Sequence, residues 1–240
     1  MSPETLSLVG KVAIITGRGR ENGLGAGIAE ALARNGASIT INYVSDSTVP
    51  VAAIQADVTT TDGASQLVTR TLKAFSVDHI DILVNNAGGG LPISTLDASD
   101  EEIHTAFAIN VFGPIYMVRA VMPHIPPGGR IINVSSVYSK ICHKTTPFYK
   151  SSKAACDSLT CTWAAEFGRG HGITVNTVAP GPVDTDLQRQ HRRNNPDEGQ
   201  PLDDLVKMTR AGDRFGRIED EKSRWITGQY IDVGGGIVVG

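Results

Sequence analysis

Short apolar runs alternate along the chain with longer segments in which alanine and leucine recur at helical spacing. Apolar, β-branched runs are typical of strands that are buried on both faces of a sheet. Such runs occupy residues 11–16, 38–43, 80–85, 130–134, 172–178 and 228–233. The helical pattern occupies residues 23–35, 62–76, 100–122 and 147–168. The alternation predicts βαβ units, and therefore an α/β fold with a parallel sheet and helices on both faces.

The 240 residues suit one α/β domain. No linker rich in proline, glycine or serine divides the chain, and no internal repeat occurs in it. We therefore expect a single domain, residues 1–240. Residues 185–217 form a long polar excursion before the last predicted strand. Such an excursion is either a lid over a site or a solvated insertion, and its position alone favours neither.

The overall charge and composition narrow the choice of partners. The formal net charge is −3 and the pI is near 6.1, which is not the basic excess of a nucleic-acid-binding protein. No apolar run in the sequence approaches the ~20 residues that span a bilayer, and the first residues lack the pattern of a secretory signal. The three cysteines and six histidines show no metal-ligand spacing. We expect a cytoplasmic protein that binds no metal, nucleic acid or membrane.

A glycine-rich turn lies between the first predicted strand and the first predicted helix. It reads Thr16-Gly17-Arg18-Gly19-Arg20-Glu21-Asn22-Gly23-Leu24-Gly25. Glycine permits the backbone angles of a sharp turn, and the missing side chains let a diphosphate approach the amides. The start of a helix adds free N–H groups and partial positive charge. A glycine cluster alone is a weak signal, but this position favours a dinucleotide phosphate site.

Thr16-Gly17 followed by Gly23-Leu24-Gly25 resembles the cofactor turn of the short-chain dehydrogenase/reductase family. Five residues, 18–22, separate these glycines, which is a longer loop than the family usually has. Further motifs follow in the family's order. They are Asn85-Asn86-Ala87-Gly88, Asn110 in the expected helix, Ser136 thirteen residues before Tyr149, Tyr149-X-X-X-Lys153, and Pro180-Gly181-Pro182-Val183-Asp184-Thr185.

The resemblance implies a Rossmann-like, doubly wound parallel sheet of about seven strands in one dinucleotide-binding catalytic domain. It implies an oxidoreductase that transfers a hydride between a nicotinamide cofactor and a ketone or secondary alcohol. Residues 185–217 would then be a substrate lid. A homodimer or homotetramer is also expected from the resemblance.

The predicted proton chemistry rests on a tyrosine and a lysine. Tyr149 and Lys153 are four residues apart in a helical segment, so they share a face. Free tyrosine has a pKa of about 10, and a nearby ammonium group favours the phenolate. Tyr149 is therefore the expected proton donor in reduction and acceptor in oxidation. Alone, such a pair is usually just two surface neighbours, and only the other motifs in register favour catalysis.

The resemblance supplies the remaining catalytic roles. Ser136 would hydrogen-bond the substrate oxygen, Asn110 would hold a water near Lys153, and Lys153 would also hold the ribose hydroxyls. Ser135 is the competing serine, because alternating strand faces send only one of the two toward the site. The distance along the chain to Tyr149 favours Ser136.

The second predicted strand bears on the choice of cofactor. It ends Asn42-Tyr43-Val44-Ser45, without the carboxylate that NAD enzymes use at this place. Arg18 and Arg20 offer positive charge to a 2′-phosphate, so NADP(H) is favoured. Asp57 either meets the adenine, as in the family, or caps the next helix. The expected cofactor-binding residues are Gly17, Arg18, Arg20, Gly23, Leu24, Gly25, Asn42, Tyr43, Ser45, Asp57, Val58, Asn86, Ala87, Gly88, Tyr149, Lys153, Pro180, Gly181, Val183 and Thr185.

A mostly apolar wall is expected around the substrate. Its members are Gly90, Val137, Tyr138, Ile141, Cys142 and Pro182, with Gly89, Leu91 and the lid beside them. This wall suits a hydrophobic or polycyclic carbonyl, such as a secondary-metabolite intermediate, although an acyl-carrier-linked substrate is an alternative. Two other hypotheses keep the fold: an isomerase or cyclase without net redox turnover, and a non-catalytic cofactor-binding or interaction protein.

Two connections are shorter than those of the family. Only seven residues, 44–50, separate Tyr43 from Val51, whereas a parallel crossover with its helix needs about 10–12 residues. A helix is also missing between Ile218 and Ser223. Shortening of this kind uncovers apolar sheet surface at a cost of roughly 25 cal/mol per Å².

Overall fold

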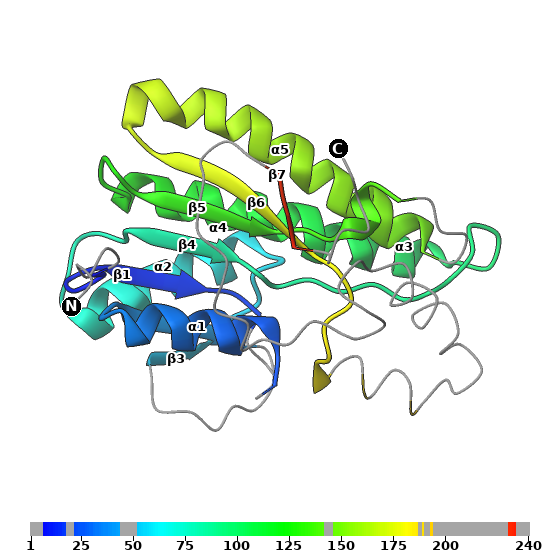
Figure 1. Ribbon diagram of the computed structural model, residues 1–240, viewed down its shortest axis with the longest axis horizontal. Helices are drawn as coiled ribbons and strands as arrows, with labels where there is room; N and C mark the ends of the chain where they lie inside the picture. Colours follow the sequence, from blue (N-terminus) through cyan, green and yellow to red (C-terminus); the bar gives the residue numbers. More distant parts are fainter. Residues whose placement is uncertain are drawn as a thin grey trace.

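One parallel sheet forms the centre of the molecule in the computed structural model (Figure 1). The structure describes residues 7–17, 22–43, 52–141, 146–186, 189, 193 and 230–233. The strands are β1 (Val12–Ile15), β2 (Ser38–Tyr43), β3 (Ala52–Gln55), β4 (Ile82–Asn85), β5 (Arg130–Val134), β6 (Thr174–Pro180) and β7 (Tyr230–Val233). Their order is β3-β2-β1-β4-β5-β6-β7, and every neighbouring pair is parallel. The predicted doubly wound sheet of seven strands is confirmed.

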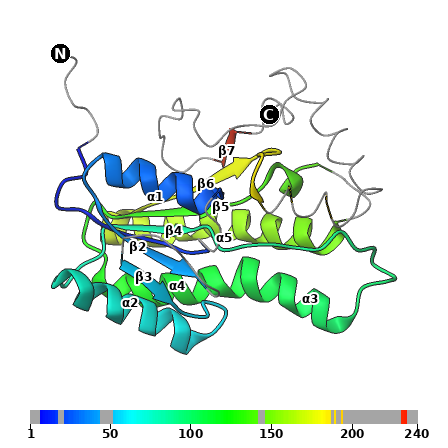
Figure 2. The same cartoon turned by 90° about the horizontal axis from the view of Figure 1, so that it is seen from below.

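Helices cover both faces of the sheet. They are α1 (Leu24–Arg34), α2 (Thr61–Phe75), α3 (Asp100–Phe107), α4 (Gly113–Val121) and α5 (Pro147–His171), with short turns η1 (Ala108–Phe112), η2 (Met122–His124) and η3 (Val137–Ser139). Figure 2 shows α1 on one side of the sheet and α2 and α4 on the other. The chain order reverses between β1 and β4, so their carboxyl ends border the crevice where doubly wound folds bind ligands.

The alternation of strand side chains explains why the strands are apolar throughout. In β1, Val12 and Ile14 pack in the cluster that contains side chains of α2, α4 and α5. Ala13 and Ile15 pack in the opposite cluster, against α1. A strand that is buried on both faces has no polar side, which is the pattern that predicted it.

The stretch Asp100–His124 is long and apolar enough to cross a membrane by length and composition alone, which the expectation from sequence did not foresee. It is a core element. Met117 and Val121 are fully buried, and both belong to the cluster that also holds Leu67 of α2 and Phe167 of α5. Its apolar face therefore packs against the sheet and the neighbouring helices.

The first short connection joins two adjacent strands. β2 and β3 pair in register, with Thr40 opposite Ala52 and Tyr43 opposite Gln55. Eight residues, 44–51, lie between these strands, outside the described residues. This number is below the length of a crossover that contains a helix, as expected from the sequence. The second short connection, residues 219–222, also lies outside the described residues.

Candidate active site

The turn after β1 and the loop after β4 are locked together. Gly17 has φ +74°, and a Cβ built on it would lie 2.4 Å from Cα of Ala87. The Thr16 hydroxyl accepts hydrogen bonds from the backbone N–H groups of Asn86 (3.1 Å) and Ala87 (3.0 Å). The Asn86 amide donates back to the Thr16 carbonyl at 2.8 Å. Three expected cofactor-binding residues, Gly17, Asn86 and Ala87, thus lie side by side. Thr16, whose hydrogen bonds hold the two segments together, was not among the predicted site residues.

The start of α1 faces the same place. A Cβ on Gly25 would lie 2.6 Å from Nδ2 of Asn86, so only glycine lets the helix come this close. Gly23 is the N-cap residue and supplies no side-chain hydrogen bond to the first turn, which Leu24 begins. The first N–H groups of α1 are therefore not capped by a side chain. Arg18 and Arg20, expected beside them, lie outside the described residues.

The end of β2 differs from the expectation. Asn42 is 1% exposed, and its Nδ2 donates to the Ala56 carbonyl at 2.8 Å. Its Oδ1 accepts a hydrogen bond from the Gly17 N–H at 3.4 Å. The amide thus ties the ends of β1, β2 and β3 together, and this correction makes Asn42 a support of the turn instead of a cofactor contact. Tyr43 is half-buried at the strand end, and Ser45 lies outside the described residues.

Asp57 is exposed just after β3. Its Oδ1 accepts hydrogen bonds from the backbone N–H (2.9 Å) and the hydroxyl (2.6 Å) of Thr59. The N-cap of α2 is Thr60, whose hydroxyl accepts from the Gly63 N–H at 3.0 Å. The alternative of Asp57 as a helix cap was therefore wrong. Val58 beside it is 3% exposed and belongs to the core.

Tyr149 and Lys153 lie one turn apart on α5. The Nζ atom of Lys153 is 5.8 Å from the centroid of the Tyr149 ring. Lys153 is 4% exposed, and its ammonium donates to the Val134 carbonyl at 2.8 Å. This bond anchors a buried cation beside the phenol, which is the arrangement that acid–base chemistry on a tyrosine requires.

Asn110 occupies a π-helical turn, η1, between α3 and α4. Its Nδ2 donates to the carbonyls of Ala106 (2.9 Å) and Gly89 (2.6 Å), and its Oδ1 accepts from the Gly89 N–H at 3.2 Å. A Cβ on Gly88 would lie 2.8 Å from both Asn110 Oδ1 and Lys153 Nζ. Gly88 therefore lies against both Asn110 and Lys153. Turns of this kind are often found at functional sites.

The two serines after β5 point to different partners, as strand alternation predicts. The Ser135 hydroxyl donates to the Lys153 carbonyl at 3.4 Å, inside the protein. Ser136 is the N-cap of η3, and its hydroxyl accepts from the Tyr138 N–H at 3.2 Å. Ser136 is 6% exposed.

Two members of the expected substrate wall, Tyr138 and Gly90, lie beside Tyr149. The rings of Tyr138 and Tyr149 meet edge to face with centroids 6.2 Å apart. Burial, and then the charge of Tyr149, raise the pKa of the Tyr138 hydroxyl. Val137 is 0% exposed and has no surface for a substrate, which corrects its place in the wall. Ile141 is half-buried and Pro182 is buried. Cys142 lies outside the described residues.

The segment after β6 returns to the glycine turn. The backbone N–H of Asn22 donates to a carboxylate oxygen of Asp186 at 3.0 Å, and the Asp186 N–H donates to the Asn22 carbonyl at 3.0 Å. Thr185, the residue before Asp186, is buried. The Arg189 guanidinium donates two hydrogen bonds to the Asp184 carboxylate, at 2.9 and 2.7 Å. The segment that begins Pro180-Gly181 and contains Val183 thus runs toward the turn. Most of the expected lid, residues 185–217, lies outside the described residues.

A buried chain of side-chain hydrogen bonds connects the strands behind the site. Asn85 Nδ2 donates to Asn133 Oδ1, and Asn133 Nδ2 donates to the Thr160 hydroxyl, both at 2.8 Å. Thr177 also donates to the Thr160 hydroxyl at 2.8 Å, and Thr160 donates to the Cys156 carbonyl at 2.9 Å. The chain joins β4, β5, β6 and α5. Asn85 is therefore a structural residue.

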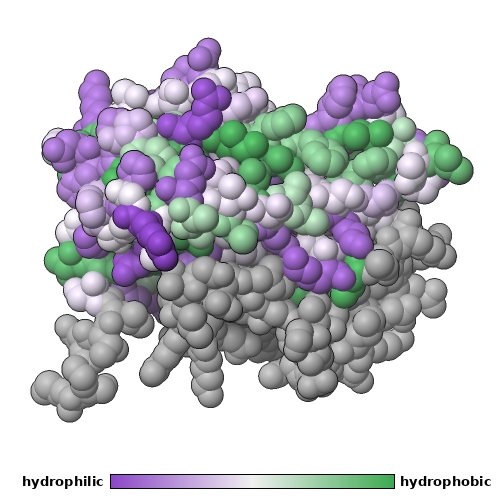
Figure 3. All heavy atoms as spheres, turned by 90° about the horizontal axis from the view of Figure 1, so that it is seen from above, coloured by the Kyte–Doolittle hydropathy of each residue, from purple (hydrophilic) through white to green (hydrophobic). Residues whose placement is uncertain are grey.

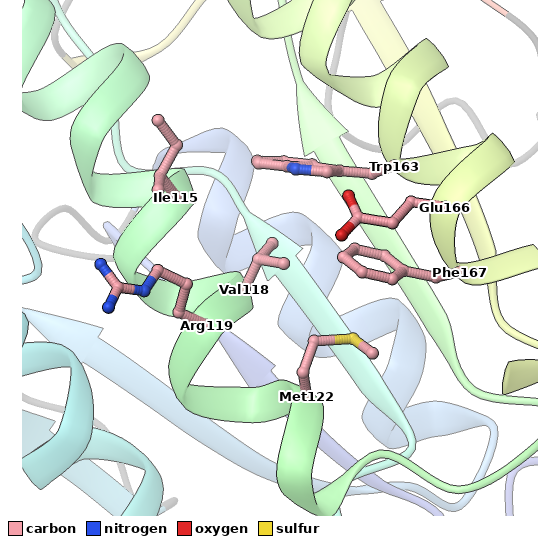
Figure 4. Close-up of a pocket in the computed structure, with 7 residues that line it drawn as sticks. All are labelled: Ile115, Val118, Arg119, Met122, Trp163, Glu166 and Phe167. Carbon is pink, nitrogen blue, oxygen red and sulfur yellow. The ribbon is translucent and has the colours of Figure 1, made fainter.

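A hollow of about 360 Å³ lies elsewhere, on the outer surface of α4 and α5 (Figure 4). Its lining residues are Ile115, Val118, Arg119, Met122, Trp163, Glu166 and Phe167. None of the expected cofactor or substrate residues lines it. It is a feature of the molecule's exterior and separate from the candidate site.

Comparison with known proteins identifies the family to which this protein belongs. Over residues 17–238 the chain matches the family described as Enoyl-(Acyl carrier protein) reductase. Together with the doubly wound sheet and the ordered motifs, this match shows that the protein belongs to the short-chain dehydrogenase/reductase family.

Individual relatives are similar over nearly their whole length. The short-chain dehydrogenase/reductase FrzI of Cladobotryum sp is 34% identical, with 97% of both chains covered. The hydroxynaphthalene reductase-like protein Arp2 of Metarhizium brunneum is 32% identical, with 97% of this chain and 96% of that protein covered. A blue fluorescent protein from a metagenomic library, solved in complex with NADPH, has a TM-score of 0.82 at 31% identity and covers 97% of this chain and 100% of its own.

Proposed function

We propose that this protein catalyses reversible hydride transfer between NADP(H) and a ketone or secondary alcohol. The observation that carries the proposal is the cluster around Gly88. The buried Lys153 ammonium and the Asn110 amide meet there, and Lys153 lies beside the Tyr149 ring. Ser136 stands at the end of the neighbouring strand. Tyr149, Lys153, Asn110 and Ser136 are the catalytic set.

The chain's own residues fit a dinucleotide. Gly17 and Gly25 leave room where a Cβ would collide, and α1 begins without a side-chain cap. A diphosphate there would meet free N–H groups. The described end of β2 carries no carboxylate that would repel a 2′-phosphate. Arg18 and Arg20 would supply the positive charge that binds it. Other contacts would come from Gly23, Leu24, Tyr43, Ser45, Asp57, Asn86, Ala87, Gly88, Pro180, Gly181, Val183 and Thr185. The structural relative solved with NADPH supports the choice of NADP(H).

Carbonyl reduction adds a hydride to carbon and a proton to oxygen. The bound cofactor supplies the hydride. The Tyr149 hydroxyl donates the proton to the carbonyl oxygen, and the Lys153 ammonium stabilises the phenolate that remains. The Ser136 hydroxyl holds the same oxygen while negative charge develops on it. In oxidation the proton moves the other way.

A hydrophobic, ring-containing carbonyl is the substrate class that we infer. The Tyr138 ring stands edge-on to Tyr149, and the half-buried Ile141 adds apolar surface, whereas Pro182 is buried. The similarity to a hydroxynaphthalene reductase-like protein supports a polycyclic secondary-metabolite carbonyl. Residues 185–217 would close over it as a lid.

The first experiment is a fluorescence titration of the purified chain with NADPH and NADH. We expect NADPH to bind roughly tenfold tighter or more, equivalent to about 1.4 kcal/mol. Replacing Arg18 and Arg20 by Ala should remove most of this preference. Tighter binding of NADH would refute the cofactor choice.

Turnover is then measured on a panel of aromatic ketones, with product mass as the readout. Reduction adds two hydrogens, whereas an isomerase adds none. Tyr149→Phe should lower kcat by about 10²–10⁴-fold and leave NADPH binding unchanged. Tyr116→Phe on α4 is the matched control and should keep parental activity. If Tyr149→Phe turned over as fast as the parent, the mechanism would be wrong.

We also infer that residues 1–240 form one catalytic domain. Copies of this chain associate as a homodimer or homotetramer through the hollow of Figure 4. Apolar residues share it with Arg119 and Glu166, which have no ion-pair partner among the described residues. A two-fold axis would pair Arg119 of one copy with Glu166 of the other. Figure 3 shows apolar side chains gathered in a band on the molecule's upper face. Light scattering of the parent should give the mass of two or four chains of 25.4 kDa each. Glu166→Arg should lower this mass, and the double substitution with Arg119→Glu should restore it. A monomeric parent would refute the inference.

A further inference from the structure

Three consecutive glycines follow β4, and each has different surroundings. A Cβ on Gly88 would press on Asn110 and Lys153, as described above. A Cβ on Gly89 would meet nothing within 4 Å. A Cβ on Gly90 would lie 2.7 Å from Cβ, 2.9 Å from Cδ2 and 3.0 Å from Cγ of Tyr149. Only Gly90 therefore lies directly against the phenol ring.

Space, and not backbone conformation, requires glycine at position 90. The described glycines with positive φ are Gly10, Gly17, Gly36, Gly128 and Gly172. Residues 88–90 are outside this group, so alanine there brings no left-handed strain. The three atoms nearest to an added Cβ at Gly90 all belong to Tyr149, so a substitution there acts first on that side chain.

Hydrogen bonds hold both sides of the contact. The loop is held because the Asn110 amide bonds both the N–H and the carbonyl of Gly89. On α5, the Ser152 hydroxyl donates to the Tyr149 carbonyl at 2.8 Å, and the Lys153 ammonium is anchored on Val134. An added methyl group would have to gain at least 0.7 Å, the difference between 2.7 Å and the 3.4 Å of ordinary contact. The nearest atom is Cβ of Tyr149, which rotation of the ring does not move, so the methyl group must displace the whole Tyr149 side chain or the loop.

We infer that Gly90 is a positioning residue for Tyr149. The backbone of Gly90 lies against the root and one edge of the ring and sets where the hydroxyl stands relative to Lys153. This inference rests on the proposed function, because it concerns the group that donates the proton. A misplacement of about 1 Å at a reacting group costs on the order of 10²-fold in rate.

Kinetics of the full chain test the inference first. Gly90→Ala should lower kcat by about 10–100-fold and leave the Kd for NADPH within about twofold of the parent. Gly170→Ala is the matched control, because it adds the same methyl group in open space at the other end of α5, away from the site. It should keep kcat within about twofold. Equal loss in both variants, or no loss in Gly90→Ala, would overturn the inference while the proposed function stands.

A second measurement does not need activity. The protein is labelled with 3-fluorotyrosine, and the Tyr149 resonance among its five tyrosines is identified with Tyr149→Phe. Gly90→Ala should move this ¹⁹F resonance, and Gly170→Ala should not. If the resonance moves as expected but the parent reduces no carbonyl, the proposed function fails and the positioning role survives.

The parent alone keeps the inference testable if Gly90→Ala does not fold. A ring held by the loop keeps the fluorine on one side or exchanges slowly between two sides, so the Tyr149 resonance should be resolved by orientation. A single resonance averaged by fast ring rotation would show that the loop does not hold the ring, and would overturn the inference.

Discussion

Thr160 is the junction of the buried hydrogen-bond chain, and Thr160→Val tests what that chain contributes. The side chain is 5% exposed. Its hydroxyl accepts from Asn133 Nδ2 and Thr177 Oγ1, both at 2.8 Å, and donates to the Cys156 carbonyl at 2.9 Å. Valine has nearly the same shape but can accept nothing, so two donors lose their partner without a change in volume.

The magnitude follows from these bonds. Each buried donor left without an acceptor costs about 1–3 kcal/mol. The Thr177 hydroxyl can rotate toward another acceptor, whereas the Asn133 amide is fixed by its bond with Asn85. The added methyl group returns about 0.8 kcal/mol. We therefore expect a net loss of about 1–2 kcal/mol, a sizeable share of the ~5–15 kcal/mol by which proteins are stable. At roughly 2–4 °C per kcal/mol, Tm should fall by about 2–8 °C.

The assay is urea unfolding followed by circular dichroism at one fixed protein concentration. Thr162→Val is the matched control. Thr162 lies on the same helix and donates to the Ser158 carbonyl at 3.2 Å, but it is exposed. Its substitution should change the free energy of unfolding by no more than about 0.5 kcal/mol. If Thr160→Val cost no more than Thr162→Val, the buried chain would contribute nothing and the reasoning would be refuted.

Two further predictions concern α5. Burial raises the pKa of the Cys156 thiol to about 11, so at pH 8 maleimide should label the exposed Cys161 and spare Cys156 in the folded protein, as mapped by peptide mass spectrometry. Equal labelling of both cysteines would contradict this prediction. Gly170→Ala should raise the free energy of unfolding by about 0.5–1 kcal/mol, because its Cβ enters open space within a helix. Gly172→Ala, at φ +67°, should lower it, and an opposite order in urea unfolding would refute the argument.

The sequence predicted the order and type of the elements well, because burial on both sheet faces leaves a local trace. The run 38–43 became β2 with the predicted bounds, Ser38–Tyr43. The run 11–16 became the shorter β1, Val12–Ile15, since Thr16 already belongs to the turn. The helix expected over 100–122 is continuous in outline, but it contains the π turn at Asn110, which no periodicity announced.

The site was predicted as a set of residues and less well as a set of contacts. Spacing placed Tyr149 and Lys153 on one face, and strand alternation separated Ser135 from Ser136, as the structure has them. Asn42 and Val137 were expected at ligands and are instead buried within the protein.

Periodicity alone predicted the helices and six of the seven described strands, whereas β3 (Ala52–Gln55) was not among the predicted runs. The doubly wound order and the residues at the carboxyl ends of the strands came from motifs that resemble those of the short-chain dehydrogenase/reductase family. These properties follow from periodicity and from motifs, which are local. Only the tertiary structure decided that Asn86 is fastened by Thr16, that Asn22 meets Asp186, and that Gly90 touches Tyr149. Such contacts join segments far apart in the chain, and their distances are set by how whole elements pack, which no local pattern records.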